Sequence, residues 1–308
     1  MPLLTVTLNP AVDKVYVVPG FGVGGVFRPS ETRVSAGGKG INASRVYGTL
    51  DGQGTATGFL GGVNGEYVRE SLTREDIPSE FVPIHGETRV CAMIVDPERQ
   101  TETVLNEVGP EVTPAECDAL MGRLRELLPR HSSVLLSGSA PAGVSPGFYD
   151  DVVRLAQDAG VKVAVDASGE ALRVAAAARP YLLKPNTEEL KALTVAGDGW
   201  AGSARMLRDQ FGLTYGMITS GSRGAVVASA EGVWQATPPP INLVSATGSG
   251  DSLTGAFLWA LEEGWSVSEA LKLGVAAGAA NATVYGSGSC TRDQILALFA
   301  QTVAERLG

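Results

Sequence analysis

Residues 247–252, Thr-Gly-Ser-Gly-Asp-Ser, combine the backbone and side chains that phosphoryl transfer to an alcohol requires. Gly248 and Gly250 let the chain turn tightly, so several backbone N–H groups can point into one small volume. We expect Asp251 to begin a helix that runs to about residue 263, whose unpaired N–H groups and dipole favour an anion. The Asp251 carboxylate would then lie beside the transferred phosphoryl group, where it can act as a base on the attacking hydroxyl.

The same turn also fits an ordinary loop with an aspartate at its helix N-cap, so the rest of the chain must decide. A second glycine-rich stretch, residues 36–44, reads Ala-Gly-Gly-Lys-Gly-Ile-Asn-Ala-Ser and leads into an expected helix through about Leu50. Its glycines open the helix N-terminus to an anion, and Lys39 adds a positive charge. The Gly-x4-Gly-Lys-Ser/Thr pattern of a Walker A loop is absent. A loop that only caps a helix is the alternative interpretation.

The composition excludes several classes of function. The chain has 308 residues, of which 44% are apolar and 19% charged, an ordinary balance for a globular protein. Its net charge of −9, with no basic run, argues against nucleic acid as a partner. Three widely spaced cysteines and two histidines give no disulfide framework, zinc site or histidine-based triad. No signal peptide and no apolar stretch of about 18 residues is present, so we expect a cytoplasmic protein without a membrane partner.

Strands and helices alternate along most of the chain, which predicts βαβ units and a mostly parallel sheet. The expected strands cover residues 3–8, 55–60, 81–84, 134–136, 161–165, 181–183, 215–218, 225–228 and 233–236. The expected helices cover residues 65–74, 114–128, 146–159, 201–211, 251–263, 267–285 and 295–306. Short antiparallel strands at residues 15–18 and 26–35, and a hairpin at 89–95 and 101–105, could lie outside this sheet. No linker divides the chain, so we expect one domain over residues 1–308.

Polar residues follow several of the expected strands. Ligands of parallel sheets collect at the carboxyl ends of the strands. We therefore predict a single site that combines the turn before Asp251 with Asn9, Asp13, Ser139, Asn186 and Thr219.

Seven motifs in a fixed order resemble those of the ribokinase-like carbohydrate kinases, in the phosphofructokinase B branch. They are Thr-Leu-Asn-Pro-Ala-Val-Asp at 7–13, Gly-Gly-Lys-Gly-Ile-Asn at 37–42, Gly-Glu-Thr-Arg at 86–89, Ser-Gly-Ser-Ala-Pro-Ala-Gly at 137–143, Lys-Pro-Asn at 184–186 with Glu189, Thr-x-Gly-x-x-Gly at 219–224 and Gly-Ser-Gly-Asp-Ser at 248–252. The likeness spans nearly the whole chain and is greatest to 1-phosphofructokinase and tagatose-6-phosphate kinase. It implies a three-layer αβα sandwich with a mostly parallel central sheet and a small β-strand lid, built from residues of about 13–35 and 86–106.

The resemblance also implies a role for individual residues. Asp251 would be the catalytic base, with Gly248, Ser249 and Gly250 as the anion hole. The phosphorylated sugar would be held by Asp13, Gly38, Lys39, Asn42, Arg89 and Ser139. ATP would be bound by Lys184, Asn186, Glu189, Thr219, Gly221, Gly224 and Asn281, the last close to the adenine. Asn186 and Glu189 would hold Mg²⁺ through water, and the lid would form a homodimer.

We therefore expect ATP-dependent phosphorylation of a ketohexose monophosphate, with fructose 1-phosphate as the preferred substrate and tagatose 6-phosphate as the alternative. A sugar-phosphate- or nucleotide-binding protein without catalysis is a more remote alternative, because both the base and the anion-hole glycines are present. A dehydrogenase is disfavoured, since no Gly-x-Gly-x-x-Gly follows the first strand.

Overall fold

The computed structural model describes residues 2–195 and 197–307. Its centre is a 10-stranded sheet in the order β14-β13-β12-β11-β10-β9-β8-β1-β4-β5. The parallel part consists of β1 (Leu3–Thr7), β4 (Gly54–Leu60), β5 (Val82–Pro83), β8 (Ser133–Ser137), β9 (Lys162–Asp166), β10 (Leu182–Leu183) and β11 (Tyr215–Thr219). An antiparallel edge follows with β12 (Ala225–Ser229), β13 (Gly232–Thr237) and β14 (Val303–Leu307).

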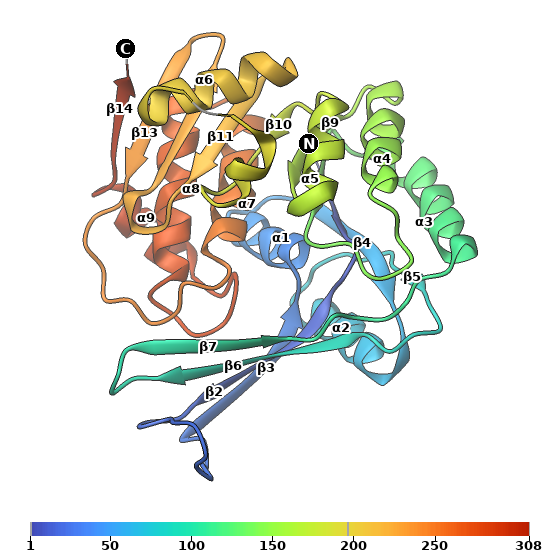
Figure 1. The fold of residues 1–308 in the computed structure, drawn as a ribbon, viewed down its shortest axis with the longest axis vertical. Helices are drawn as coiled ribbons and strands as arrows, with labels where there is room; N and C mark the ends of the chain where they lie inside the picture. The colour runs from blue at the N-terminus through green and yellow to red at the C-terminus, as the bar shows by residue number, and fades with distance from the viewer. Residues whose placement is uncertain (1, 196, 308) are drawn as a thin grey trace.

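Helices cover both faces of this sheet (Figure 1). One face is covered by α1 (Lys39–Thr49), α7 (Ser249–Glu262), α8 (Val267–Asn281) and α9 (Arg292–Phe299). The other is covered by α3 (Pro114–Leu127), α4 (Gly147–Asp158), α5 (Gly169–Ala177) and α6 (Gly199–Phe211). In β1, Leu3 joins the core under the first set of helices, and Leu4 and Val6 join the core under the second. Both faces are buried, which is why the parallel strands are continuous apolar runs.

A second sheet of four strands, the small sheet, projects from this body (Figure 1). Its order is β3-β2-β6-β7, with β2 (Ala11–Val17), β3 (Glu31–Gly37), β6 (Arg89–Asp96) and β7 (Thr101–Asn106). The pairs β2–β3 and β6–β7 are antiparallel, as expected, and β2–β6 is parallel. Helix α2 (Gly62–Arg74) packs against the base of the small sheet, where Val12 and Ala36 share a core with Val68 and Leu72. The expected mostly parallel sheet with helices and a small separate sheet is thus confirmed.

The expected helix over residues 295–306 is wrong in its second half. Helix α9 ends at Phe299, and Val303–Leu307 forms strand β14. The strand pairs antiparallel with β13, from Val303 opposite Thr237 to Leu307 opposite Val233. These hydrogen bonds to a distant part of the chain outweigh the local helical pattern, because β13 would otherwise present an unpaired edge. Among the described residues, no helix is long and apolar enough to cross a membrane.

Other element bounds also differ from the expectation. Residues 26–30 are not in a strand, and β3 begins at Glu31. Helix α7 begins two residues before Asp251, at Ser249. Helix α8 ends at Asn281 rather than near residue 285, and the short helix α5 was not anticipated.

Candidate active site

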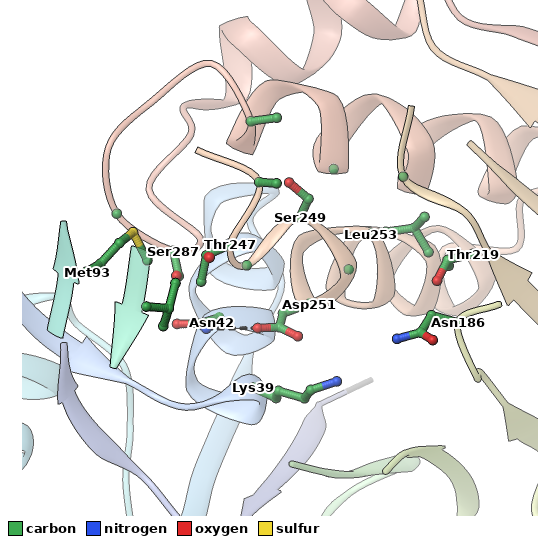
Figure 2. Close-up of a pocket in the computed structure, with 18 of the residues that line it drawn as sticks. Lys39, Asn42, Met93, Asn186, Thr219, Thr247, Ser249, Asp251, Leu253 and Ser287 are labelled. Atoms are coloured by element: carbon green, nitrogen blue, oxygen red, sulfur yellow. Dashed lines mark hydrogen bonds between the residues drawn. The ribbon is translucent and has the colours of Figure 1, made fainter. Parts of the chain in front are cut away.

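A cavity of about 1160 Å³ opens where the carboxyl ends of the parallel strands meet the small sheet. Side chains from elements far apart in sequence enter it (Figure 2), with Asn186 and Thr219 at one end, Met93 and Ser287 at the other, and Lys39 and Asp251 between them. Most of the residues predicted from the sequence line this cavity. They are Asp13, Gly38, Lys39, Asn42, Arg89, Ser139, Lys184, Asn186, Thr219, Gly221, Gly224, Gly248, Ser249, Gly250 and Asp251.

The turn before α7 has the geometry of an anion site. Gly248 has φ +83°, and a Cβ at this position would lie 2.6 Å from the Cβ of Ser287, so only glycine fits. Gly250 is open, since a Cβ there would meet only the Nζ of Lys184, at 3.7 Å. The N–H of Ser249 donates to the backbone oxygen of Ala246 at 3.2 Å, and Gly250, the next residue, puts no side chain in front of the start of α7.

Asp251 lies in the first turn of α7 and is buried, with 8% of its surface exposed. The Nδ2 of Asn42 donates a hydrogen bond to its Oδ2 at 2.8 Å (Figure 2). Burial raises the pKa of the Asp251 carboxyl, against the opposing effect of the Lys39 ammonium. A carboxylate with a raised pKa is a stronger base toward a hydroxyl than an ordinary surface aspartate.

Asp166, at the end of β9, joins two of the predicted lysines. Its Oδ1 lies 2.8 Å from the Nζ of Lys39, and its Oδ2 lies 2.8 Å from the Nζ of Lys184. Burial alone would raise the pKa of Asp166, but Lys184 and Lys39 hold it below its usual value. Burial alone would lower the pKa of Lys39, but the Asp166 carboxylate opposes this effect, and the pKa of Lys39 lies above its usual value. Two ammonium groups are thus fixed beside the anion-binding turn.

Sequence reasoning did not include Asp166 in the site. A signal was present, because Asp166 ends the apolar strand Lys162–Asp166 and so lies at the carboxyl end of a parallel strand. Its two partners, however, lie 127 and 18 residues away, and only the fold brings them together.

Where the small sheet lines the cavity, it contributes Asp13 on β2 and Arg89 at the start of β6. The Arg89 guanidinium donates to the backbone oxygens of Asn9, at 3.0 Å, and Glu107, at 2.8 Å. Burial raises the pKa of Asp13 to about 6, although Arg45 and Arg89 oppose this shift. This end of the site therefore offers one cation together with hydrogen-bonding groups.

The other end of the cavity contains a rigid polar turn. The Oδ1 of Asn186 accepts from the N–H groups of Glu188 and Glu189, at 2.9 and 2.8 Å, and the Oε2 of Glu189 accepts from the Asn186 N–H at 2.8 Å. Glu189 does not line the cavity. No cluster of three or more metal-ligating His, Cys, Asp or Glu side chains occurs within the described part of the chain. Carboxylate and amide oxygens nevertheless fit a Mg²⁺ ion that keeps most of its ligands from water and phosphate.

Asn281, predicted to approach the adenine, is not among the residues that line the cavity. It is fully buried behind the anion-binding turn. Its Nδ2 donates to the backbone oxygen of Thr247 at 2.8 Å and to the Oγ of Ser249 at 3.3 Å, and its Oδ1 accepts from the N–H of Gly288 at 2.6 Å. Asn281 therefore supports the shape of the turn.

Known proteins are similar to this one over nearly the whole chain. The tagatose-6-phosphate kinase of Staphylococcus epidermidis is 33% identical over 305 residues, covering 97% of this chain and 98% of the relative. The 1-phosphofructokinase of Borreliella burgdorferi is 34% identical over 285 residues, 91% of each chain. Phosphofructokinase-2 of Escherichia coli, solved in complex with substrates and products, superposes with a TM-score of 0.91 at 29% identity over 98% of this chain and 99% of that one. Another structure of the E. coli enzyme is of a tetrameric inhibited form.

These relatives agree with a sequence model that matches residues 6–294, nearly the whole chain. Family, fold and kinase class, all expected from the sequence motifs, are thereby confirmed. The chain belongs to the pfkB family of carbohydrate kinases.

Proposed function

We propose that this kinase transfers the γ-phosphoryl group of ATP to a hydroxyl of a ketohexose monophosphate. Fructose 1-phosphate is the first candidate, giving fructose 1,6-bisphosphate, and tagatose 6-phosphate is the second. The observation that carries this proposal is that Asp251 lines one cavity together with the anion-binding turn and with Lys39 and Lys184, the two lysines that Asp166 joins. Relatives named for each of the two activities support it.

A phosphate already present on the sugar fits the end of the cavity that contains Arg89. Arg89 binds backbone oxygens rather than a carboxylate, so its positive charge remains available to a dianion. Lys39, 37% exposed at its side chain, offers a second cation within the same cavity. In a chain of net charge −9, such cations attract a phosphorylated sugar locally. Asp13 and Asn42 would bind hydroxyl groups of the sugar, Gly38 would lie against the sugar, and Ser139 would lie close to its phosphate.

The chemical step requires a base and charge stabilisation, and the cavity offers both. Asp251 accepts the proton of the attacking hydroxyl, and the N–H groups of Gly248 and Gly250 stabilise the transferred phosphoryl oxygens. Lys184, held by Asp166, places a positive charge beside the same oxygens, and Asp166 also holds Lys39, the cation that would bind the phosphate on the sugar. Asn186 and Glu189 would hold Mg²⁺ through water, and the ion would neutralise charge on the ATP phosphates. Thr219, Gly221 and Gly224 would border the nucleotide.

We propose further that the small sheet acts as a lid over the sugar and forms a homodimer. Its strands carry exposed apolar side chains, including Val34 on β3 and Leu105 on β7, which are 44% and 58% exposed. Apolar side chains grouped on a projecting sheet are suited to pairing with a second copy. Light scattering should give twice the monomer mass for the wild type and the monomer mass for Leu105→Asp. A monomeric wild type at micromolar concentration would contradict the dimer.

The substrate assignment is tested by ADP release in the presence of ATP, Mg²⁺ and one sugar at a time. We expect the highest kcat/KM with fructose 1-phosphate, a lower value with tagatose 6-phosphate or fructose 6-phosphate, and the lowest with unphosphorylated sugars. The reverse order of the first two would assign the alternative substrate. Sugar phosphates that raise the melting temperature without any ADP release would instead indicate a binding protein. Because the reaction consumes ATP, we place it in the cytoplasm.

A further inference from the structure

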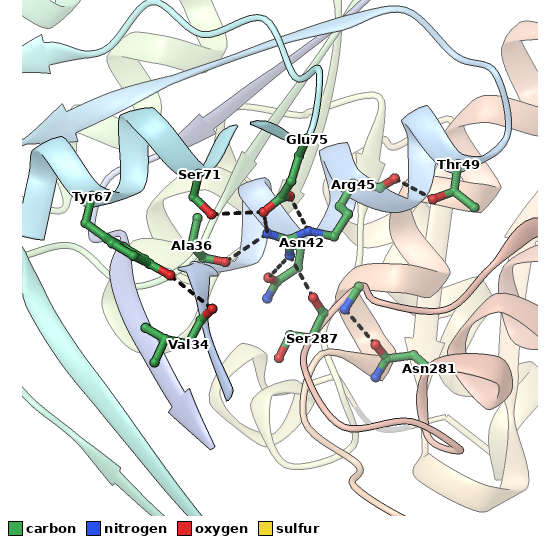
Figure 3. Close-up of polar contacts among 11 residues, drawn as sticks. Val34, Ala36, Asn42, Arg45, Thr49, Tyr67, Ser71, Glu75, Asn281 and Ser287 are labelled. Carbon is green, nitrogen blue, oxygen red and sulfur yellow. Dashed lines mark hydrogen bonds and ion pairs between the residues drawn. The ribbon is translucent and has the colours of Figure 1, made fainter. Parts of the chain in front are cut away.

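Arg45 lies on α1, three residues after Asn42, and does not line the cavity; Figure 3 shows its polar contacts. Its side chain is only 12% exposed. All five of its N–H donors are used. Two donate to the Glu75 carboxylate, at 2.6 Å to Oε2 and 3.2 Å to Oε1, and one donates to the Oδ1 of Asn42 at 3.3 Å. The other two donate to the backbone oxygens of Ser287, at 2.7 Å, and Ala36, at 3.0 Å. A guanidinium with every donor committed to a different direction has a fixed position.

Glu75, just after α2, holds this guanidinium from the side remote from the cavity. It accepts from Arg45 with both carboxylate oxygens, which is the strongest geometry for such a pair. The Oγ of Ser71 donates to the Oε1 of Glu75 at 3.1 Å and fixes the carboxylate in turn. The Arg45–Glu75 pair is therefore a rigid support behind the site.

The contact with Asn42 determines which end of its carboxamide faces the catalytic aspartate. A guanidinium only donates hydrogen bonds, so the atom of Asn42 that faces Arg45 must be its oxygen. The Nδ2 is then directed to the Oδ2 of Asp251, at 2.8 Å. With the amide turned over, an oxygen would face the carboxylate and two acceptors would oppose each other.

Arg45 also donates to the backbone oxygens of Ala36 and Ser287, which belong to the two segments next to the Asn42–Asp251 hydrogen bond. Ala36 immediately precedes the Gly37-Gly38 turn that leads into α1. Ser287 packs against Gly248, where a Cβ would come within 2.6 Å of it. One side chain thus connects the segment before the Gly37-Gly38 turn, α1 and the loop at Ser287 behind the anion-binding turn.

We propose that Arg45, held by Glu75, is a positioning residue that fixes the Asn42 amide so that it donates to Asp251. This inference rests on the proposed function, because it assigns Arg45 a part in the action of the same base. Arg45 touches no reacting atom. Its effect is to keep Asp251 charged and oriented until the hydroxyl arrives.

A lysine at position 45 would retain the charge but not the geometry. An ammonium group has three donors at one point and cannot reach Glu75, Asn42 and both backbone oxygens together. We therefore expect Arg45→Lys to fold and to lower kcat roughly 10- to 100-fold, equivalent to the loss of one charge-assisted hydrogen bond.

The decisive experiment is a double-mutant cycle of kcat in the full-length protein, with Arg45→Lys, Asn42→Ala and the pair. If Arg45 acts through Asn42, Arg45→Lys changes kcat by less than about threefold once Asn42 is alanine. If Arg45 is merely structural, Arg45→Lys lowers kcat by the same factor whether residue 42 is asparagine or alanine, and this result overturns the inference. If Arg45→Lys does not fold, Glu75→Gln replaces it in the cycle, with the same two outcomes. Arg154→Lys, in the exposed pair with Asp150 on α4, is the matched control and should leave kcat unchanged.

The pH profile provides a readout that loss of stability would not move. The Asn42 hydrogen bond lowers the pKa of Asp251 against the effect of burial, so its loss raises that pKa. The acidic limb of kcat/KM should then move to higher pH in Arg45→Lys, and an unshifted limb contradicts the inference. The charged groups that face Asp251 remain in place in this variant, namely Asp13, Lys39, Asp166 and Lys184.

Lack of turnover by the wild type with any sugar phosphate would refute the proposed function itself, whereas an active wild type with an additive cycle refutes only the role of Arg45.

Discussion

Replacement of Asp166 by asparagine keeps the size of the side chain and removes the negative charge between Lys39 and Lys184. Both pairs measure 2.8 Å, and the side chains of Lys184 and Asp166 are 4% and 2% exposed. Loss of one partner of a buried pair costs about 3–5 kcal/mol, because the other charge is left without compensation. For a chain of 308 residues this corresponds to a fall in Tm on the order of 5–8 °C.

The same variant should affect catalysis more than binding. Without Asp166 the two ammonium groups lose their fixed position, and a displacement of about 1 Å at a reacting centre costs roughly 100-fold in rate. The KM values for ATP and sugar phosphate should not rise, since the site gains net positive charge. ADP-release kinetics and calorimetry measure the two effects, with Asp150→Asn, at a partly exposed ion pair on α4, as the control. A kcat within threefold of the wild type, with Tm within about 1 °C, would refute the role of Asp166 and its two lysines.

Three further changes test other parts of the site. Arg89→Ala should raise KM for the sugar phosphate roughly 10- to 100-fold with little change in KM for ATP, and equal KM values before and after would contradict a phosphate contact. Gly248→Ala should lower both Tm and kcat, the latter on the order of 100-fold, because φ is +83° and the new Cβ meets Ser287 at 2.6 Å. Burial raises the pKa of Asp13 to about 6 in the folded protein, so the folded state favours the protonated carboxyl. The contribution of Asp13 to the free energy of unfolding is therefore fully present below about pH 4 and is lost as pH rises through 6. Asp13→Asn should remove this loss in melting curves recorded from pH 4 to 7, and a variant with the same pH dependence as the wild type would show that another group is responsible.

The parallel strands and the strand-end residues could be predicted from the sequence, because both depend on local patterns. Buried parallel strands are apolar on both faces, and their ends meet at one edge of the sheet. The glycine-rich turns before Asp251 and around Lys39 carry their backbone requirements in their own residue types. This explains why most predicted site residues line one cavity.

The remaining features depend on contacts between distant segments. Strand β14 exists because it pairs with β13, about 70 residues away, although its own residues also fit a helix. Asn281 lies on a helix of small residues, and only packing decides that its amide faces Thr247 rather than a ligand. Arg45 resembles an ordinary surface arginine until α2 brings Glu75 against it.

The central claim is that the Asp251 carboxylate is the base, and Asp251→Asn tests it most directly. The variant keeps an oxygen that can accept from Asn42, so the local structure should survive. We expect kcat to fall by about 10² to 10⁴ while calorimetry shows sugar-phosphate affinity within a few fold of the wild type. Turnover at the wild-type rate by a correctly folded Asp251→Asn would contradict the account.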